Sequence, residues 1–130
     1  MDSQHMRSPL GRAAGLGSAK EGVGHWWLER VTAVALVPLT LWLAVSLIML
    51  ADSDYATFIA WLKSPFVALS MLLLLIALFT HLALGLQVVI EDYVHSAAMI
   101  PLLVAMRFAC VALAVAGMLA TLLVFFGGGA

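Results

Sequence analysis

Three long apolar stretches dominate the sequence and limit the folds open to it. They run from about Leu28 to Ala51, from Phe66 to about Ile90 and from about Ala97 to Phe126. Each exceeds the roughly 20 residues that an α-helix needs to cross the hydrocarbon core of a bilayer. The sequence therefore predicts an all-α membrane protein with three transmembrane helices.

Composition supports this class and excludes others. The 130 residues are 65% hydrophobic and 10% charged, which rules out an ordinary soluble domain. The formal net charge of −1 gives no reason to expect nucleic acid as a partner. The single cysteine, Cys110, lies in an apolar run, so this chain can build neither a disulfide framework nor a thiolate metal cluster.

The distribution of basic residues predicts the orientation. The first loop carries only Lys63, whereas the N-terminal segment and its border carry Arg7, Arg12, Lys20 and Arg30. The positive-inside rule then places the N-terminus in the cytoplasm, the Glu91–Ser96 loop inside and the C-terminus outside. Aromatic belts fit this orientation, with Trp26 and Trp27 at the inner interface and Trp61 at the outer one.

The N-terminal segment differs in composition from the rest. It is rich in Gly, Ser and Ala and lacks periodicity, which predicts a cytoplasmic arm over residues 1–24 and a membrane anchor domain over residues 25–130. No apolar run separates its charges from the first full span, so we expect no cleaved signal peptide.

The first loop contains the stripe of a short amphipathic helix. Apolar side chains recur at i, i+3, i+4 and i+7 through Tyr55, Phe58, Ile59 and Leu62. Asp52 or Ser53 is the expected N-cap, and Pro65 separates this helix from the second span. The pattern predicts a helix lying in the outer interface.

The second span carries a polar stripe. At 100° per residue, His81, Gly85, Val88 and Asp92 fall within about 60° of one another on a helical wheel. An ionisable side chain inside a membrane span is a functional-site hypothesis by default. One interpretation is a histidine that bonds to a neighbouring helix or lines a watery cavity. The other is an axial haem ligand, with the glycine giving a porphyrin edge room to approach.

The chain offers one histidine at membrane depth. His25 and His95 flank the spans, and His5 lies in the arm. A six-coordinate haem would therefore take its second axial ligand from another subunit.

Asp92 and Tyr93 follow the second span on the predicted cytoplasmic side. An acid at a helix C-terminus faces the negative end of the dipole, which costs a few tenths of a kcal/mol. The pair is either a solvated loop with an interfacial tyrosine or a functional pair. In the second case the phenol donates a hydrogen bond to a lipid-soluble carbonyl compound and Asp92 orients it.

Two arginines lie in or beside the spans. Arg30 is either a snorkelling stem or a partner for a haem propionate or quinone oxygen. Arg107 is deeper, so we expect it to face protein, a propionate or an inner cavity. We expect packing roles for Pro38, Cys110 and Gly117.

With these features, the chain resembles the family of smaller hydrophobic anchor subunits of succinate dehydrogenase, respiratory complex II, in its alphaproteobacterial form. The resemblance covers nearly the whole chain. Its most specific motif is His81-x10-Asp92-Tyr93, supported by Ser8–Lys20, Gly24–Ala33 and Glu91–His95.

The resemblance implies one half of a heterodimeric haem-binding helical bundle in a bacterial inner membrane. The expected partners are a second three-helix cytochrome b anchor, an iron–sulfur subunit and a flavoprotein, which together pass electrons from succinate to ubiquinone. His81 matches the axial ligand of haem b, Tyr93 the hydrogen-bond donor to the quinone and Asp92 its acidic neighbour. Arg30 matches an arginine near the haem propionates, whereas His25 is out of register with a propionate histidine of some relatives. Gly85 is expected to pack beside the ring because it lies one turn from His81 on the same face.

Three alternatives remain open at this point. An anchor of a quinol:fumarate reductase would run related chemistry in reverse, and several such anchors carry two haems or none. A structural or assembly membrane protein would hold no cofactor. A small transporter is a poor fit, because the chain has no internal repeat.

Overall fold

The computed structural model describes residues 18–127, with side chains from residue 22 onward. Over this range the chain forms four α-helices and no strand. The helices are α2 (Ser18–Leu50), α3 (Tyr55–Leu62), α4 (Pro65–Tyr93) and α5 (Met99–Phe126). The predicted all-α class is confirmed.

Three of these helices are long and apolar enough to cross a membrane. They are α2 from Gly22 onward, α4 and α5, and they confirm the three spans that the apolar stretches predict. Both α2 and α4 are longer than predicted, because α2 begins at Ser18 and α4 ends at Tyr93. Extending an existing helix adds one backbone hydrogen bond for each residue fixed, so helices readily run past the apolar stretch.

These longer helices change two predicted boundaries. Most of the predicted arm, residues 1–17, lies outside the described residues, but residues 18–24 belong to α2. Glu91, Asp92 and Tyr93 form the last turn of α4, so the loop predicted over Glu91–Ser96 begins three residues later than expected. The connection to α5 is instead Val94–Ala98.

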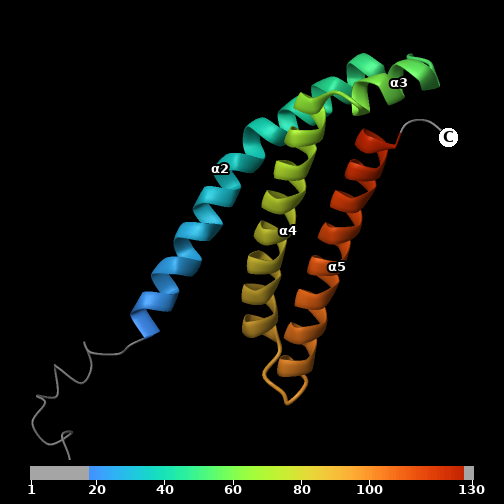
Figure 1. Cartoon of the computed structure of the whole chain (residues 1–130). Coiled ribbons are helices and arrows are strands. Elements are labelled where there is room, and N and C mark those ends of the chain that lie inside the picture. Colours follow the sequence, from blue (N-terminus) through green and yellow to red (C-terminus); the bar gives the residue numbers. More distant parts are fainter. Residues whose placement is uncertain (1–17, 128–130) are drawn as a thin grey trace, which may run out of the picture.

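The central helix is α4, which packs against α2 on one side and against α5 on the other. Figure 1 shows α4 and α5 side by side and antiparallel, while α2 leans away from α4 toward its own N-terminal end. The N-terminal end of α2 and the α4–α5 connection lie at one end of the bundle. The short helix α3 and the end of α5 lie at the other.

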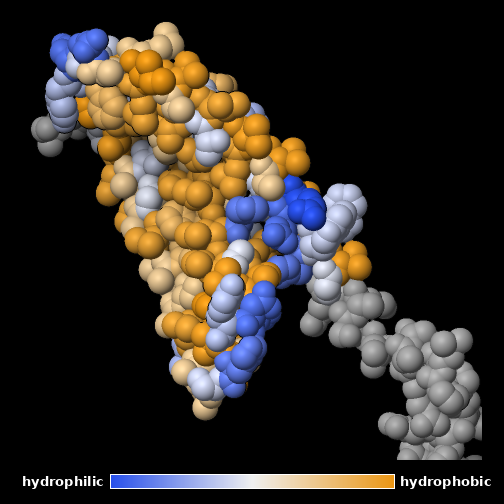
Figure 2. All heavy atoms as spheres, turned by 180° about the vertical axis from the view of Figure 1, so that it is seen from behind, coloured by the Kyte–Doolittle hydropathy of each residue, from blue (hydrophilic) through white to orange (hydrophobic). Residues whose placement is uncertain are grey.

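The core of this single chain is thin. Its buried apolar residues are Val67, Ala68, Leu74 and Ala77 of α4 and Cys110 of α5, and two polar residues, Thr32 and Ser70, are buried with them. Most large apolar side chains on the helices are exposed, and Figure 2 shows a broad hydrophobic surface on this face, interrupted by hydrophilic residues at the lower right and upper left. Exposed apolar area of this extent marks contact with lipid or with another protein.

The predicted helix in the first loop is confirmed as α3, but its cap differs from the prediction. Asp54 is the N-cap, and its Oδ1 accepts a hydrogen bond from the Thr57 backbone N–H at 3.0 Å. The Ser53 hydroxyl instead donates to the Leu50 carbonyl at 2.7 Å. Hydrogen bonds from Thr57 hold the pKa of Asp54 below its ordinary value.

Aromatic side chains fasten α3 to the neighbouring helices. The Trp61 ring stacks on Trp42 of α2 with 6.0 Å between centroids, and Phe66 of α4 meets Trp42 edge-on. Phe58, Ile59 and Leu62 of the predicted stripe are half-buried. Tyr55, the first member of that stripe, is 80% exposed, so the stripe packs over only part of its length.

Candidate functional site

His81 lies on the face of α4 that packs against α2. Leu74 and Ala77 are buried on α4, and His81 continues their spacing by one more helical turn. The His81 Nδ1 lies 3.0 Å from the Thr32 Oγ1 of α2. Thr32 is only 7% exposed, so this polar contact is part of the interface between the two helices.

The surroundings of Thr32 determine which atom carries the proton. Thr32 Oγ1 lies 2.8 Å from the Leu28 carbonyl oxygen and 3.0 Å from that of Glu29. A hydroxyl has one proton, and an oxygen–oxygen contact this short is repulsive without a proton between the atoms. The Thr32 hydroxyl therefore donates to its own helix, as threonines in helices commonly do. Toward His81 it then acts as an acceptor.

This assignment fixes the tautomer of the imidazole. In neutral histidine one ring nitrogen is a donor and the other an acceptor. With Nδ1 assigned as the donor to Thr32, Nε2 of the neutral ring keeps its lone pair. A neutral imidazole with a free Nε2 is the form that binds a metal, so the residues present fit a haem ligand at His81.

Gly85 lies one turn after His81, and its surroundings support the same interpretation. A Cβ built on Gly85 would meet no described atom of the chain within 4 Å, whereas one on Gly117 would lie 3.1 Å from Leu75 side-chain carbons. Gly117 thus has a packing role inside this chain, as predicted. Gly85 faces open space, which leaves room for a flat group or a partner helix.

Asp92 and Tyr93 are carried by the same helix as His81 but lie apart from it. His81 and Tyr93 are separated by a rise of about 18 Å along α4, because each residue adds about 1.5 Å. Both Asp92 and Tyr93 are exposed, and the Tyr93 side chain is 82% exposed. The tyrosine is therefore accessible to a ligand or subunit at this end of the bundle.

Arg30 lies against an aromatic ring at the start of α2. Its guanidinium carbon is 5.3 Å from the centroid of the Trp26 ring, in a cation–π contact. At 100° per residue, Arg30 and Thr32 are about 200° apart around α2. Arg30 thus starts from the face opposite the His81 contact, and its role with haem propionates stays a prediction.

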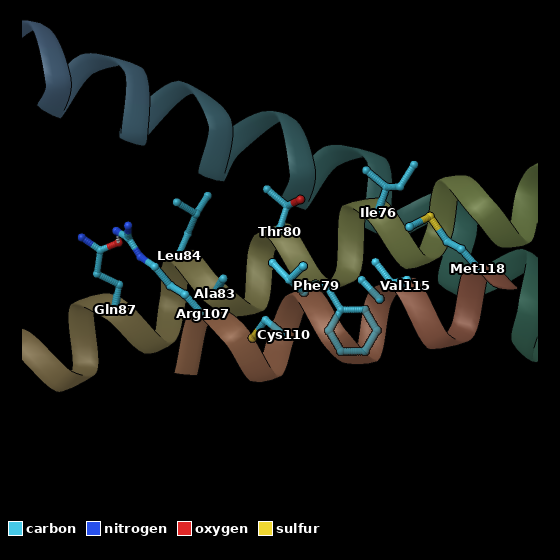
Figure 3. Close-up of a pocket in the computed structure, with 12 residues that line it drawn as sticks. Ile76, Phe79, Thr80, Ala83, Leu84, Gln87, Arg107, Cys110, Val115 and Met118 are labelled. Atoms are coloured by element: carbon cyan, nitrogen blue, oxygen red, sulfur yellow. Dashed lines mark hydrogen bonds between the residues drawn. The ribbon is translucent and has the colours of Figure 1, made fainter. Parts of the chain in front are cut away.

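Arg107 contacts protein through a residue that the sequence did not single out. Its guanidinium donates to the Gln87 Oε1 of α4 at 2.8 Å, and the Gln87 amide donates to the Glu91 Oε1 at 2.8 Å. Gln87 could have been singled out from the sequence, because it is an amide side chain inside an apolar span. Figure 3 shows Arg107 and Gln87 pointing toward one another at one end of a mostly apolar groove between α4 and α5, which Thr80 also lines.

This groove has a volume of about 440 Å³ and is separate from the His81 site. Its lining comes from α4 and α5, and neither His81 nor Thr32 takes part. Cys110 lines the groove and is only 6% exposed, which confirms its predicted packing role. Pro38 is exposed on α2, so a packing role for this residue stays a prediction. Among the described residues, no three His, Cys, Asp or Glu side chains group as a metal site.

Comparison with known proteins gives consistent matches. A family model described as "Succinate dehydrogenase/Fumarate reductase transmembrane subunit" matches residues 4–116. The succinate dehydrogenase hydrophobic membrane anchor subunit of Rickettsia bellii is 41% identical over 88 residues, covering 68% of this chain and 70% of that protein. That of Rickettsia conorii is 35% identical, covering 68% and 71%. That of Paracoccus denitrificans is 35% identical, covering 66% and 67%.

Proposed function

The chain belongs to the succinate dehydrogenase/fumarate reductase transmembrane subunit family, and we propose that it anchors a succinate:ubiquinone oxidoreductase in the membrane. We propose succinate oxidation as the direction of the reaction, and the names of the relatives as succinate dehydrogenase anchors support this choice. The three spanning helices make it a multi-pass membrane protein. It is not catalytic alone.

In this proposal His81 supplies one axial ligand to a b-type haem. The His81–Thr32 contact supports it, because with Nδ1 assigned as the donor the Nε2 lone pair stays available. The same contact is also the bond to a neighbouring helix that the cofactor-free interpretation predicts, so the haem spectrum decides between the two. The open space beside Gly85 supports it further. When bound, the haem would supply one-electron redox chemistry. A second ligand would come from another anchor subunit, and Arg30 would pair with a propionate of the haem.

Tyr93 is the proposed donor to ubiquinone, and Asp92 is its acidic neighbour. The phenol is exposed at the end of α4, where a quinone headgroup can reach it while the isoprenoid tail stays in lipid. A neutral hydrogen bond of this kind contributes about 0.5–1.5 kcal/mol net. Quinone reduction also consumes protons, and a Tyr–Asp pair at the water boundary is suited to deliver them.

The exposed apolar faces fit two neighbours. Lipid covers part of them, and a second three-helix anchor covers the face near Gly85, since a polar stripe in a membrane needs a protein face. The N-terminal end of α2 and the Tyr93 end of α4 share one end of the bundle. We place this end on the cytoplasmic side of a bacterial inner membrane, where the iron–sulfur subunit and the flavoprotein dock.

Purification of the full chain from native membranes tests this function. The expected complex contains a flavoprotein, an iron–sulfur protein and a second anchor, shows one haem in its optical spectrum, and reduces ubiquinone with succinate. Two haems, with fumarate reduction as the faster direction, would support the fumarate reductase alternative. A complex without a Soret band would favour a cofactor-free anchor.

A further inference from the structure

We infer that Thr32 is a positioning residue for His81, and that its hydroxyl sets the tautomer, the ring orientation and the donor strength of this histidine toward haem iron. The inference deepens the proposed function and rests on it. Thr32 does not touch the haem in this account; it acts only through the imidazole.

The contact restrains the ring in two ways. The Thr32 hydroxyl is tied to the Leu28 carbonyl at 2.8 Å, so its lone pair toward His81 has a fixed direction. The side chain is β-branched, and few χ1 rotamers are open to it on a helix. An imidazole bonded to such an acceptor loses the freedom to turn over and present Nδ1 in place of Nε2.

The same contact affects the electronic properties of the ligand. When a ligating histidine donates a hydrogen bond from its other ring nitrogen, the nitrogen that binds the metal becomes more basic. Because the Thr32 hydroxyl itself donates to a carbonyl, the chain of two hydrogen bonds strengthens its acceptor capacity. A more basic Nε2 stabilises ferric over ferrous haem. Loss of the Thr32 hydroxyl should therefore shift the haem midpoint potential to a more positive value.

The chain provides a matched control on the same helix. Thr40 makes the same type of bond, from its hydroxyl to the Leu36 carbonyl at 2.6 Å. It is exposed and has no bond to a histidine among the described side chains. Thr32→Val and Thr40→Val therefore remove equivalent helix bonds, but only the first removes a partner of His81.

The test uses the complete complex carrying Thr32→Val, Thr32→Ser or Thr40→Val. The readouts are the haem midpoint potential and the g-values of its low-spin electron paramagnetic resonance signal. We expect a positive shift and altered g-values for Thr32→Val, and wild-type values for Thr40→Val. Thr32→Ser should stay close to wild type, because it keeps the hydroxyl. If the Val variant fails to assemble, Thr32→Ala replaces it.

Two outcomes would overturn the inference. One is a hydroxyl-free variant with the wild-type potential and g-values. The other is a serine variant that shifts as far as the valine variant, which would assign the effect to the lost methyl group. Both are distinct from failure of the proposed function, in which the wild-type complex has no low-spin haem or keeps the same haem after His81→Leu.

Discussion

Gly117 of α5 faces Leu75 of α4 so closely that a Cβ on residue 117 would lie 3.1 Å from both terminal methyl carbons of the leucine. A larger side chain at position 117 would therefore press against Leu75 at the contact between α4 and α5. Small residues at helix interfaces permit such contacts throughout membrane proteins, because close packing drives association where lipid offers no hydrophobic gain.

Substitution of Gly117 by valine should loosen this contact. Overpacking of this kind costs about 1–3 kcal/mol, which should lower the thermal midpoint of the purified complex. Leu75→Ala makes room for the added methyl groups, so the double variant should be more stable than the sum of the two single changes predicts. Strict additivity would show that Gly117 and Leu75 do not share this contact.

Replacing Gly85 by leucine should reduce haem binding without disturbing the fold. A Cβ there meets no described atom of this chain, so α4 should keep its packing. In the complex the added side chain occupies the space beside the haem, and we expect haem content to fall severalfold. Gly22→Leu is the control, because Gly22 is equally open but lies near the start of α2. Full haem occupancy in Gly85→Leu would contradict the proposed haem position.

Tyr93→Phe should separate quinone reduction from succinate oxidation. It removes one hydroxyl and keeps the ring, so succinate oxidation with a soluble dye should persist while ubiquinone reduction falls severalfold or more. Tyr55→Phe is a matched control, since Tyr55 is similarly exposed at the other end of the bundle. Equal loss of both activities would indicate damaged assembly. Unchanged activities would leave Tyr93 as an interfacial residue.

The cap of α3 should respond to pH. Thr57 lowers the pKa of Asp54, so the stabilisation is fully present above the ordinary pKa of an aspartate and is lost as the pH falls through the lowered value. Asp54→Ala should speed backbone hydrogen exchange in the first turn of α3 at neutral pH. Asp52→Ala should leave that exchange unchanged. The reverse result would restore Asp52 as the cap.

Much of the fold could be predicted from local sequence patterns. The three spans follow from apolar length, and the α3 helix follows from the spacing of Phe58, Ile59 and Leu62. Helix ends were harder to predict. The last turn of α4 carries two acids that oppose the helix dipole, which favours an earlier end, yet the helix runs on to Tyr93.

The site could be predicted only in part, for a physical reason. His81 and Gly85 stand out because each is unusual within its own segment. Gln87 is also a polar residue in an apolar segment, but the roles of Thr32 and Gln87 depend on partners from another helix, His81 for Thr32 and Arg107 for Gln87. Such pairs depend on the register between packed helices, and the periodicity of one segment does not encode it.

The role of His81 as a haem ligand is tested most directly by the low-spin haem signal of the purified complex carrying His81→Leu. His95→Leu serves as its control, because His95 is exposed in the α4–α5 connection. We expect His81→Leu to abolish or shift the low-spin signal, even if a substitute ligand keeps the haem bound, and His95→Leu to leave it unchanged. An unaltered spin state and midpoint potential in His81→Leu would contradict the assignment of this histidine as an axial ligand.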